Sequence, residues 1–227
     1  MISTLIAKEP QNQNQFDTYF SEGGVVLGPY TSHIWRNDPR HMCFLFSRYK
    51  FCAKMLTDKK KVLEVGCGDS IGTPIVLQSV QYVHGIDFEP LVLEDAAKRN
   101  TYGTRCTYSI HDITKAPVPD LFDAAFSLDV IEHIPPDLEN AFFSNIAASL
   151  TKDGIAIIGT PNSTAHQYAS EGSRLGHVNL KSGDTMRQSL SNHFSNVFIF
   201  SMNDEVVHTG FSPMAHYIIG IGVGVKK

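Results

Sequence analysis

Short apolar runs alternate with helix-length stretches through the middle of the chain. The runs occupy residues 61–65, 82–86, 105–110, 122–128 and 154–159, and helices are expected between them at about 72–80, 90–100 and 137–150. Buried parallel strands read as such runs, and crossover helices join them. The alternation therefore predicts an α/β fold whose parallel, doubly wound sheet is covered by helices on both faces.

The C-terminal part departs from this alternation. An expected helix at about 181–193 is followed by two further apolar runs, at 196–202 and 214–225. The connection between these runs is too short for a crossover helix. We therefore expect them to form an antiparallel pair at one edge of the sheet.

The N-terminal part precedes the first apolar run and is expected to be helical. Residues 1–15 are polar and predict a frayed end, whereas Phe16 to Phe20 could begin a short helix. Gly28-Pro29 predicts a turn. Asp38 is expected to cap a helix over 39–56, with Pro39 at its first position.

Composition and charge exclude several classes of protein. The 227 residues include 19 Lys and Arg against 23 Asp and Glu, a formal charge of −4, and no basic stripe of the kind that nucleic-acid binders carry. No apolar run approaches the roughly 20 residues of a membrane helix. Cysteines 43, 52, 67 and 106 form no C-x-x-C pair, so we expect reduced thiols and a cytoplasmic protein.

A glycine loop follows the first expected strand. Gly66, Cys67 and Gly68 let the backbone turn tightly and let a ligand approach it, and the loop leads into a helix N-terminus that favours a negative group. The next glycine is Gly72, so the loop is not the G-x-G-x-x-G of dinucleotide binders, and because it has no Gly-Lys-Ser/Thr it is not a P-loop. A tight turn without a ligand is the alternative interpretation.

Acidic residues follow the second and third expected strands. Asp87 lies 19 positions beyond Gly68, where a carboxylate can accept hydrogen bonds from ribose hydroxyls. Asp112, with Ile113 beside it, could accept a hydrogen bond from the exocyclic amine of a purine. The alternatives are that Asp87 caps the next helix and that Asp112 only forms a turn.

Four motifs in order resemble those of the class I S-adenosylmethionine-dependent methyltransferases. They are VLEVGCG, GIDF, HDI and SLDVIEHI, within about residues 60–160. The stretch DVIEHI is similar to the small-molecule branch that includes ubiquinone-biosynthesis O-methyltransferases. The resemblance implies a Rossmann-like seven-stranded sheet in a single-domain protein, with residues 59–227 as the cofactor-binding domain and residues 1–58 as a helical cap or lid.

The resemblance also implies a set of cofactor contacts. The methionine part of S-adenosylmethionine is expected along the glycine loop, the ribose at Asp87, and the adenine beside Phe88. Glu64 is expected beneath the loop, near the cofactor's amino group, and Arg48 is the candidate for its carboxylate, with Lys50 and Lys54 as alternatives. The expected cofactor-binding residues are Arg48, Glu64, Gly66, Cys67, Gly68, Asp87, Phe88, Asp112, Ile113 and Asp129.

His133 is the candidate catalytic base, because it follows the fourth strand near where the methyl group should point. An imidazole that titrates near pH 6.5 can accept the proton of a hydroxyl nucleophile. The alternative is that His133 only packs against the following helix. A second interpretation is that Asp129, Glu132 and His133 hold a divalent metal ion, which would lower the pKa of the hydroxyl directly.

Two segments could enclose a substrate. The polar stretch Ser163 to Asp184 is long for a connection, and we expect it to form part of a lid, with Arg174 and His177 as its contacts. The segment from Tyr30 to Arg40 could close from the other side. The alternatives are that the first segment is an ordinary surface insertion and that the second is a helix that only covers the sheet.

These features favour an S-adenosylmethionine-dependent methyltransferase that acts on a small molecule, by O-methylation of a hydroxyl in a biosynthetic pathway. N-methylation of a small amine and a non-catalytic protein that binds the cofactor are the alternatives. The glycine spacing and Glu64 speak against a nicotinamide-dependent oxidoreductase. A nucleic-acid target is not expected, because the chain lacks the Asn/Asp-Pro-Pro-Tyr/Phe stretch that N-methylating DNA and RNA enzymes of this fold often show after the fourth strand. No membrane partner is expected.

Overall fold

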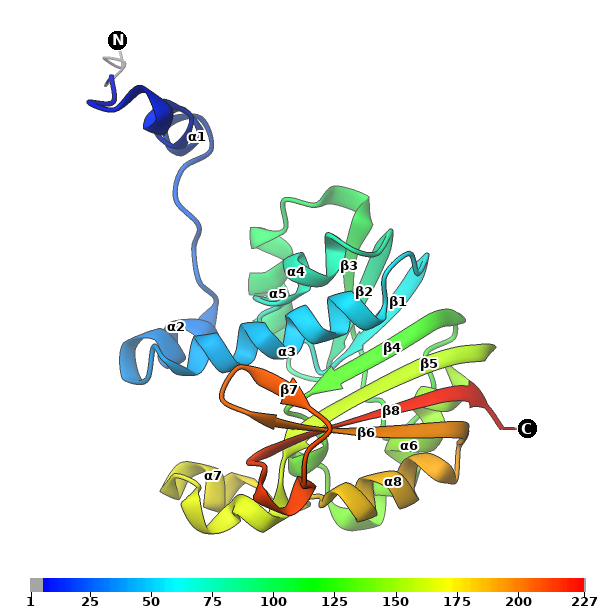
Figure 1. Cartoon of the computed structure of the whole chain (residues 1–227). Helices are drawn as coiled ribbons and strands as arrows, with labels where there is room; N and C mark the ends of the chain where they lie inside the picture. Colours follow the sequence, from blue (N-terminus) through cyan, green and yellow to red (C-terminus); the bar gives the residue numbers. More distant parts are fainter. Residues whose placement is uncertain (1–5, 227) are drawn as a thin grey trace.

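The computed structural model describes residues 6–226 and places eight strands in one sheet, in the order β3-β2-β1-β4-β5-β8-β6-β7 (Figure 1). The strands are β1 (Lys61–Val65), β2 (Tyr82–Asp87), β3 (Cys106–Ile110), β4 (Phe122–Leu128), β5 (Leu150–Pro161), β6 (Phe194–Asn203), β7 (Val206–His208) and β8 (Tyr217–Val225). Strands β1 to β5 are mutually parallel, and β8 pairs antiparallel with both β5 and β6. The predicted Rossmann-like α/β class and the antiparallel C-terminal pair are confirmed.

The sheet has eight strands in the described residues, one more than the seven expected. The additional strand, β7, pairs with β6 over only three residues and forms the edge. So short a segment, directly after a turn, gives no apolar run of strand length. The extra strand therefore lengthens the hairpin at the edge without changing the topology of the site.

Helices cover both faces of the sheet. The α-helices of the described residues, not all of which touch the sheet, are α1 (Gln13–Glu22), α2 (Pro29–Asn37), α3 (His41–Met55), α4 (Thr73–Leu77), α5 (Pro90–Arg99), α6 (Glu139–Ala148), α7 (Glu171–Gly176) and α8 (Gly183–Ser191). One buried apolar cluster joins the sheet to α6 and α8, through residues such as Phe142 and Met186. A second joins the opposite face to α3 and α4, through residues such as Cys52 and Val76.

The entry to α3 differs from the expectation. Pro29 begins α2 instead of a turn, and Asp38 ends α2, because its backbone N–H donates to the carbonyl of Ile34. The helix α3 begins at His41 and has no side-chain cap. The prediction that Asp38 caps a helix from Pro39 is therefore wrong, since a preceding helix already uses Asp38.

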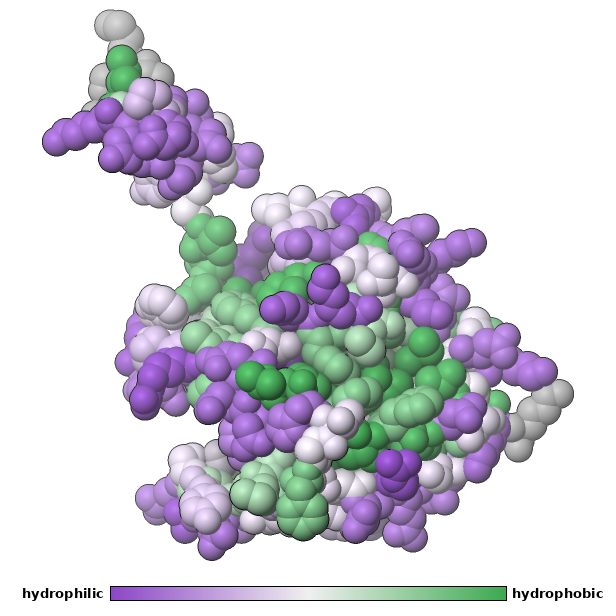
Figure 2. Space-filling model, in the orientation of Figure 1, coloured by the Kyte–Doolittle hydropathy of each residue, from purple (hydrophilic) through white to green (hydrophobic). Residues whose placement is uncertain are grey.

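The N-terminal helix α1 stands away from the rest of the molecule, as Figure 1 shows. It is mostly hydrophilic in Figure 2, although Phe16, Tyr19 and Phe20 are exposed on it. The short segment that joins α1 to α2 reaches the body at Gly28, beside the glycine loop. None of the helices in residues 6–226 has the length and apolar character needed to cross a membrane.

Candidate cofactor pocket and active site

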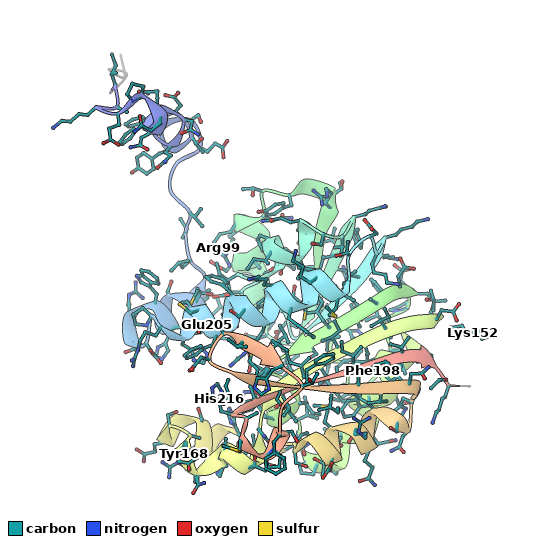
Figure 3. All side chains as sticks on the ribbon, viewed as in Figure 1. Arg99, Lys152, Tyr168, Phe198, Glu205 and His216 are labelled. Atoms are coloured by element: carbon teal, nitrogen blue, oxygen red, sulfur yellow. The ribbon has the colours of Figure 1, made fainter. Side chains whose placement is uncertain are left out.

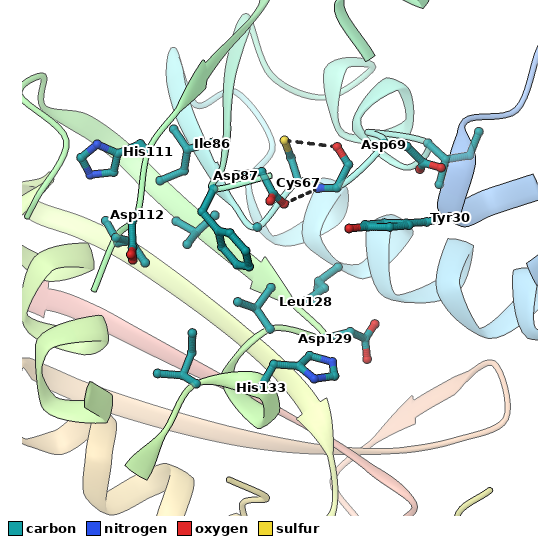
Figure 4. Close-up of a pocket in the computed structure, with 18 of the residues that line it drawn as sticks. Tyr30, Cys67, Asp69, Ile86, Asp87, His111, Asp112, Leu128, Asp129 and His133 are labelled. Carbon is teal, nitrogen blue, oxygen red and sulfur yellow. Dashed lines mark hydrogen bonds between the residues drawn. The ribbon is translucent and has the colours of Figure 1, made fainter. Parts of the chain in front are cut away.

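A cavity of about 650 Å³ lies at the carboxyl ends of β1, β2 and β4 (Figure 4). The order of strands places β1 between β2 and β4, which is the point where ligands bind in open α/β sheets. Helices α2 and α3 close the cavity from the side of the N-terminus. The lining combines polar groups from the strand ends with apolar groups from both helices.

The glycine loop forms the cavity floor after β1. Gly66 and Gly68 have φ angles of +72° and +49°, which favour glycine. A methyl group at Gly66 would lie 2.4 Å from Cγ2 of Val130, and one at Gly68 would lie 3.2 Å from the ring of Tyr30. The loop therefore needs glycine to turn and to let the neighbouring side chains approach, and its backbone faces the cavity.

Asp87 ties this loop to the end of β2. Its Oδ2 accepts a hydrogen bond from the Gly68 N–H at 2.9 Å, and its Oδ1 accepts one from the Glu89 N–H at 3.0 Å. The cap of α5 is Glu89, whose carboxylate accepts from the Leu91 N–H. Asp87 therefore stabilises the loop instead of capping the helix directly, and its carboxylate still lines the cavity.

Asp112, Ile113 and Phe88 also line the cavity. Asp112 forms a turn as well, because its Oδ1 accepts from the Thr114 N–H and hydroxyl. The hydrogen bond from Thr114 is the main reason why the pKa of Asp112 is lowered, so the carboxylate is ionised at neutral pH. Ile113 is buried, whereas Phe88 is 70% exposed.

Glu64 lies beneath the glycine loop, but its carboxylate does not line the cavity. Its Oε1 accepts from the Tyr49 hydroxyl at 3.0 Å, and its Oε2 accepts from the Thr73 hydroxyl at 2.5 Å. Complete burial raises the pKa of Glu64 to about 7. Glu64 thus supports the loop from below, through α3 and α4.

Arg48 lies behind the cavity wall. It is 6% exposed, and its Nη1 donates to both carboxylate oxygens of Asp129, at 2.8 and 2.6 Å. Asp129 follows β4 and does line the cavity. Lys50 and Lys54, the alternatives to Arg48, are exposed on α3 and lie outside the cavity lining.

His133 stands on the cavity wall next to Asp129 in Figure 4. Its Nδ1 lies 2.9 Å from the carbonyl oxygen of Gly176. Since a carbonyl only accepts, this contact requires a proton on Nδ1. Neutral His133 therefore presents its Nε2 as an acceptor.

Glu132, His133 and His177 form a cluster whose potential ligand atoms all lie within 4.8 Å of one another. Burial, followed by the charge of Asp129, raises the pKa of Glu132, and its Oε2 accepts from the Thr160 hydroxyl. The expected metal trio included Asp129 in place of His177. In the structure, Asp129 is paired with Arg48, and His177 packs edge-on against His133.

The segment 163–184 contains a 3-10 helix (Ser163–Tyr168) and α7 before α8 begins. The carbonyl of Glu132 accepts from the backbone N–H groups of Val178 and Asn179, which brings His177 to the site. Arg174 instead donates to the carbonyl of Ala169 and is exposed. Tyr168, labelled in Figure 3, is 82% exposed, so only part of this segment approaches the pocket.

Helix α2 contributes three cavity residues, Tyr30, Thr31 and Ile34. Thr31 donates its N–H and its hydroxyl to the buried carboxylate of Asp69, at 2.7 and 2.8 Å. This contact anchors α2 to the glycine loop. The sequence reasoning missed Asp69, although its place directly after the loop could have indicated it.

The comparisons with known proteins agree with this geometry. Residues 62–154 match the family described as a methyltransferase domain. The matched residues make up less than half of the chain. The predicted resemblance to S-adenosylmethionine-dependent methyltransferases is thereby confirmed over these residues.

Curated relatives of this methyltransferase domain are named ubiquinone biosynthesis O-methyltransferase. The protein from Rickettsia felis is 34% identical over 116 residues, 48% of this chain and 45% of the relative. The one from Rickettsia conorii is 35% identical over 123 residues, 51% of this chain and 40% of the relative. The matches thus span less than half the length of these two relatives.

Solved structures share the fold. The N-methyltransferase NodS from Bradyrhizobium japonicum WM9 has a TM-score of 0.63 and 16% identity, covering 84% of this chain and 99% of that one. A TehB-like methyltransferase from Corynebacterium glutamicum has a TM-score of 0.65 and 16% identity, covering 86% and 96%. At these identities the likeness concerns the fold alone.

Proposed function

We propose that the chain transfers a methyl group from S-adenosylmethionine to a hydroxyl oxygen of a small molecule in a biosynthetic pathway. The observation that carries the proposal is His133 on the wall of the glycine-loop pocket, with Nδ1 bound to the Gly176 carbonyl and Nε2 left as an acceptor. The partial similarity to ubiquinone biosynthesis O-methyltransferases supports oxygen as the acceptor atom.

The residues of the pocket fit S-adenosylmethionine. The backbone of Gly66 to Gly68 faces the cavity, Asp87 offers a carboxylate at the end of β2, and Asp112 offers another after β3. We assign the methionine part to the loop with Cys67, the ribose to Asp87, and the adenine to Phe88, Asp112 and Ile113. Glu64 and Arg48 would act from behind the wall, through the loop and through Asp129.

When bound, the cofactor supplies a methyl group on a sulfonium sulfur, which leaves with the bonding electron pair as the acceptor oxygen bonds to the methyl carbon. The protein aligns the two reactants, an effect that can contribute up to about 7–11 kcal/mol to lowering the barrier. His133 Nε2 accepts the proton of the hydroxyl, and its Nδ1–H keeps the ring oriented. General-base catalysis of this kind contributes about 10²–10⁴ in rate.

A divalent ion is the second route that the geometry supports. Glu132, His133 and His177 offer one carboxylate and two imidazole ligands in one cluster. An ion held there would supply a Lewis acid that lowers the pKa of the acceptor hydroxyl. N-methylation of an amine, and binding of the cofactor without turnover, remain the alternative functions.

We also infer the role of the segments around the pocket. Within residues 1–58, α2 and α3 would act as a helical cap or lid over the domain at 59–227, since they contribute Tyr30, Ile34 and Leu45 to the cavity, whereas α1 stands away from it (Figure 1). The segment 163–184 would enclose the acceptor from the side of His177, and Figure 2 shows the surface notched between α2 and α7. The four free cysteines support a cytoplasmic location.

Transfer of a labelled methyl group tests the proposal. The purified chain is incubated with methyl-labelled S-adenosylmethionine and a panel of hydroxylated and amine-bearing metabolites. Label in a hydroxylated product supports O-methylation. Label only in amine products would contradict O-methylation and favour N-methylation. Cofactor binding without any methyl transfer would favour a non-catalytic protein.

A further inference from the structure

Arg48 occupies an unusual place for a guanidinium. It lies between the Asp129 carboxylate, to which Nη1 donates at 2.8 and 2.6 Å, and the ring of Tyr217, whose centroid is 3.8 Å from Cζ. Both Arg48 and Tyr217 are buried, and Tyr217 belongs to β8, which lies between β5 and β6 in the sheet. The Arg48 guanidinium is thus enclosed between the Tyr217 ring and the Asp129 carboxylate.

Several unfavourable features meet at this point. Arg48 Nε and the Tyr217 hydroxyl are two of the three buried side-chain polar atoms without a hydrogen-bond partner in residues 6–226. Asp129 has a φ angle of +58°, which is rare for a residue other than glycine. Unpaired polar groups and strained backbone persist where the surrounding structure enforces them, and they concentrate at functional sites. In this structure the unpaired polar atoms and the unusual φ angle all occur at or around the Asp129 carboxylate.

The carboxylate of Asp129 borders the part of the pocket assigned to the methionine end of the cofactor. Val130, the next residue, packs against Gly66 so closely that a methyl group there would lie 2.4 Å from it. Asp129 itself lines the cavity, whereas Arg48 lies behind it and does not. A cationic ligand in the cavity therefore meets the carboxylate before it meets the guanidinium.

We propose that Arg48 is a positioning residue that holds Asp129 against the cofactor, so that the site distinguishes the charged methyl donor from its neutral-sulfur product. The inference depends on the proposed function. S-adenosylmethionine carries a positive sulfonium and S-adenosylhomocysteine does not. The Asp129 carboxylate would stabilise the first ligand relative to the second and so favour release of the product.

Calorimetric titration of the full chain with each ligand tests this role. The wild type is compared with Asp129→Asn, Arg48→Gln and the double variant. We expect the ratio of the Kd for S-adenosylmethionine to the Kd for S-adenosylhomocysteine to rise on the order of tenfold in Asp129→Asn. Arg48→Gln displaces the carboxylate but also removes a positive charge beside it, so Arg48→Lys is measured with it. The double variant should show no further rise, because Arg48 acts through Asp129.

Lys181→Gln is the matched control. Lys181 is a buried cation paired with Glu139 outside the cavity, so its loss should lower the melting temperature without changing the ratio. Arg48→Lys separates the positioning of Asp129 from the charge of Arg48, and it also serves if Arg48→Gln has no cooperative melting transition. Arg48→Lys keeps the charge but cannot contact both oxygens from a planar group, and an increased ratio is again expected.

Three outcomes would overturn the inference. An unchanged ratio in Asp129→Asn would show that the carboxylate does not sense the sulfonium. An equal loss of affinity for both ligands in Arg48→Gln would show direct binding of the methionine carboxylate, as would a further effect of Arg48→Gln in the Asp129→Asn background. A wild type that binds neither ligand would instead refute the proposed function.

Discussion

Replacing Asp87 by alanine removes a carboxylate that the glycine loop and, in our proposal, the cofactor ribose share. The side chain is half-buried and accepts backbone hydrogen bonds from Gly68 and Glu89. Hydrogen bonds to charged groups contribute about 1.5–3 kcal/mol each. Because of partial exposure, we expect both together to lower the free energy of unfolding by about 2–3 kcal/mol, which for a chain of this length lowers the melting temperature by about 4–12 °C.

The effect of Asp87→Ala on cofactor affinity should be larger than its effect on stability. The two ribose hydroxyls would lose their charged acceptor, which at about 1.5 kcal/mol each weakens binding by about 100-fold or more. Calorimetry with S-adenosylhomocysteine and a melting curve measure both quantities. We expect the folded state to survive, with a lowered melting temperature and little or no cofactor binding.

Asp123→Ala is the control for Asp87→Ala. Asp123 also accepts two backbone hydrogen bonds, from Lys60 and Lys61 at the opposite end of β1, and it lies outside the cavity. It should lower the melting temperature by a similar amount and leave the affinity unchanged. Normal affinity in Asp87→Ala, with a melting temperature like that of the control, would refute the assignment of Asp87 to the cofactor.

Three further predictions concern the buried and catalytic groups. His133→Ala should lower methyl transfer by about 10²-fold or more and leave the Kd for S-adenosylhomocysteine within about twofold; equal rates would remove the base. Glu64 has a pKa raised to about 7 in the folded protein, so the folded state binds the extra proton and stability should fall as the pH rises from about 4.5 to 7. Glu64→Gln should flatten this decline in urea unfolding series, by about 3 kcal/mol over that range, and an unchanged slope would contradict the burial argument. If a divalent ion takes part, Mg²⁺ should stimulate transfer in the wild type but not in His177→Ala, whereas full activity after chelation would exclude that route.

The positions of the parallel strands could be predicted from the sequence, because buried parallel strands are nearly continuous apolar runs. The same reasoning located the strand ends, where Asp87, Asp112, Asp129 and His133 all border one cavity. The strand β7 escaped prediction, because three residues after a turn are not an apolar run.

Contacts between distant elements could not be predicted. Arg48 and Asp129 are 81 residues apart, and their pairing depends on how α3 packs across the end of β4. His177 approaches His133 because the carbonyl of Glu132 binds the backbone just beyond it. The anchoring of α2 by Asp69 likewise depends on where the chain returns to the glycine loop. Each of these contacts depends on how distant elements pack together, and no local sequence pattern indicates it.

The central claim is that the glycine-loop cavity binds S-adenosylmethionine and its product. Isothermal titration of the purified chain with S-adenosylhomocysteine, with and without Mg²⁺, tests it most directly. We predict one site per chain with micromolar affinity, lost in Asp87→Ala and retained in Asp123→Ala. No heat of binding at millimolar ligand, from a chain that still melts cooperatively, would contradict the account.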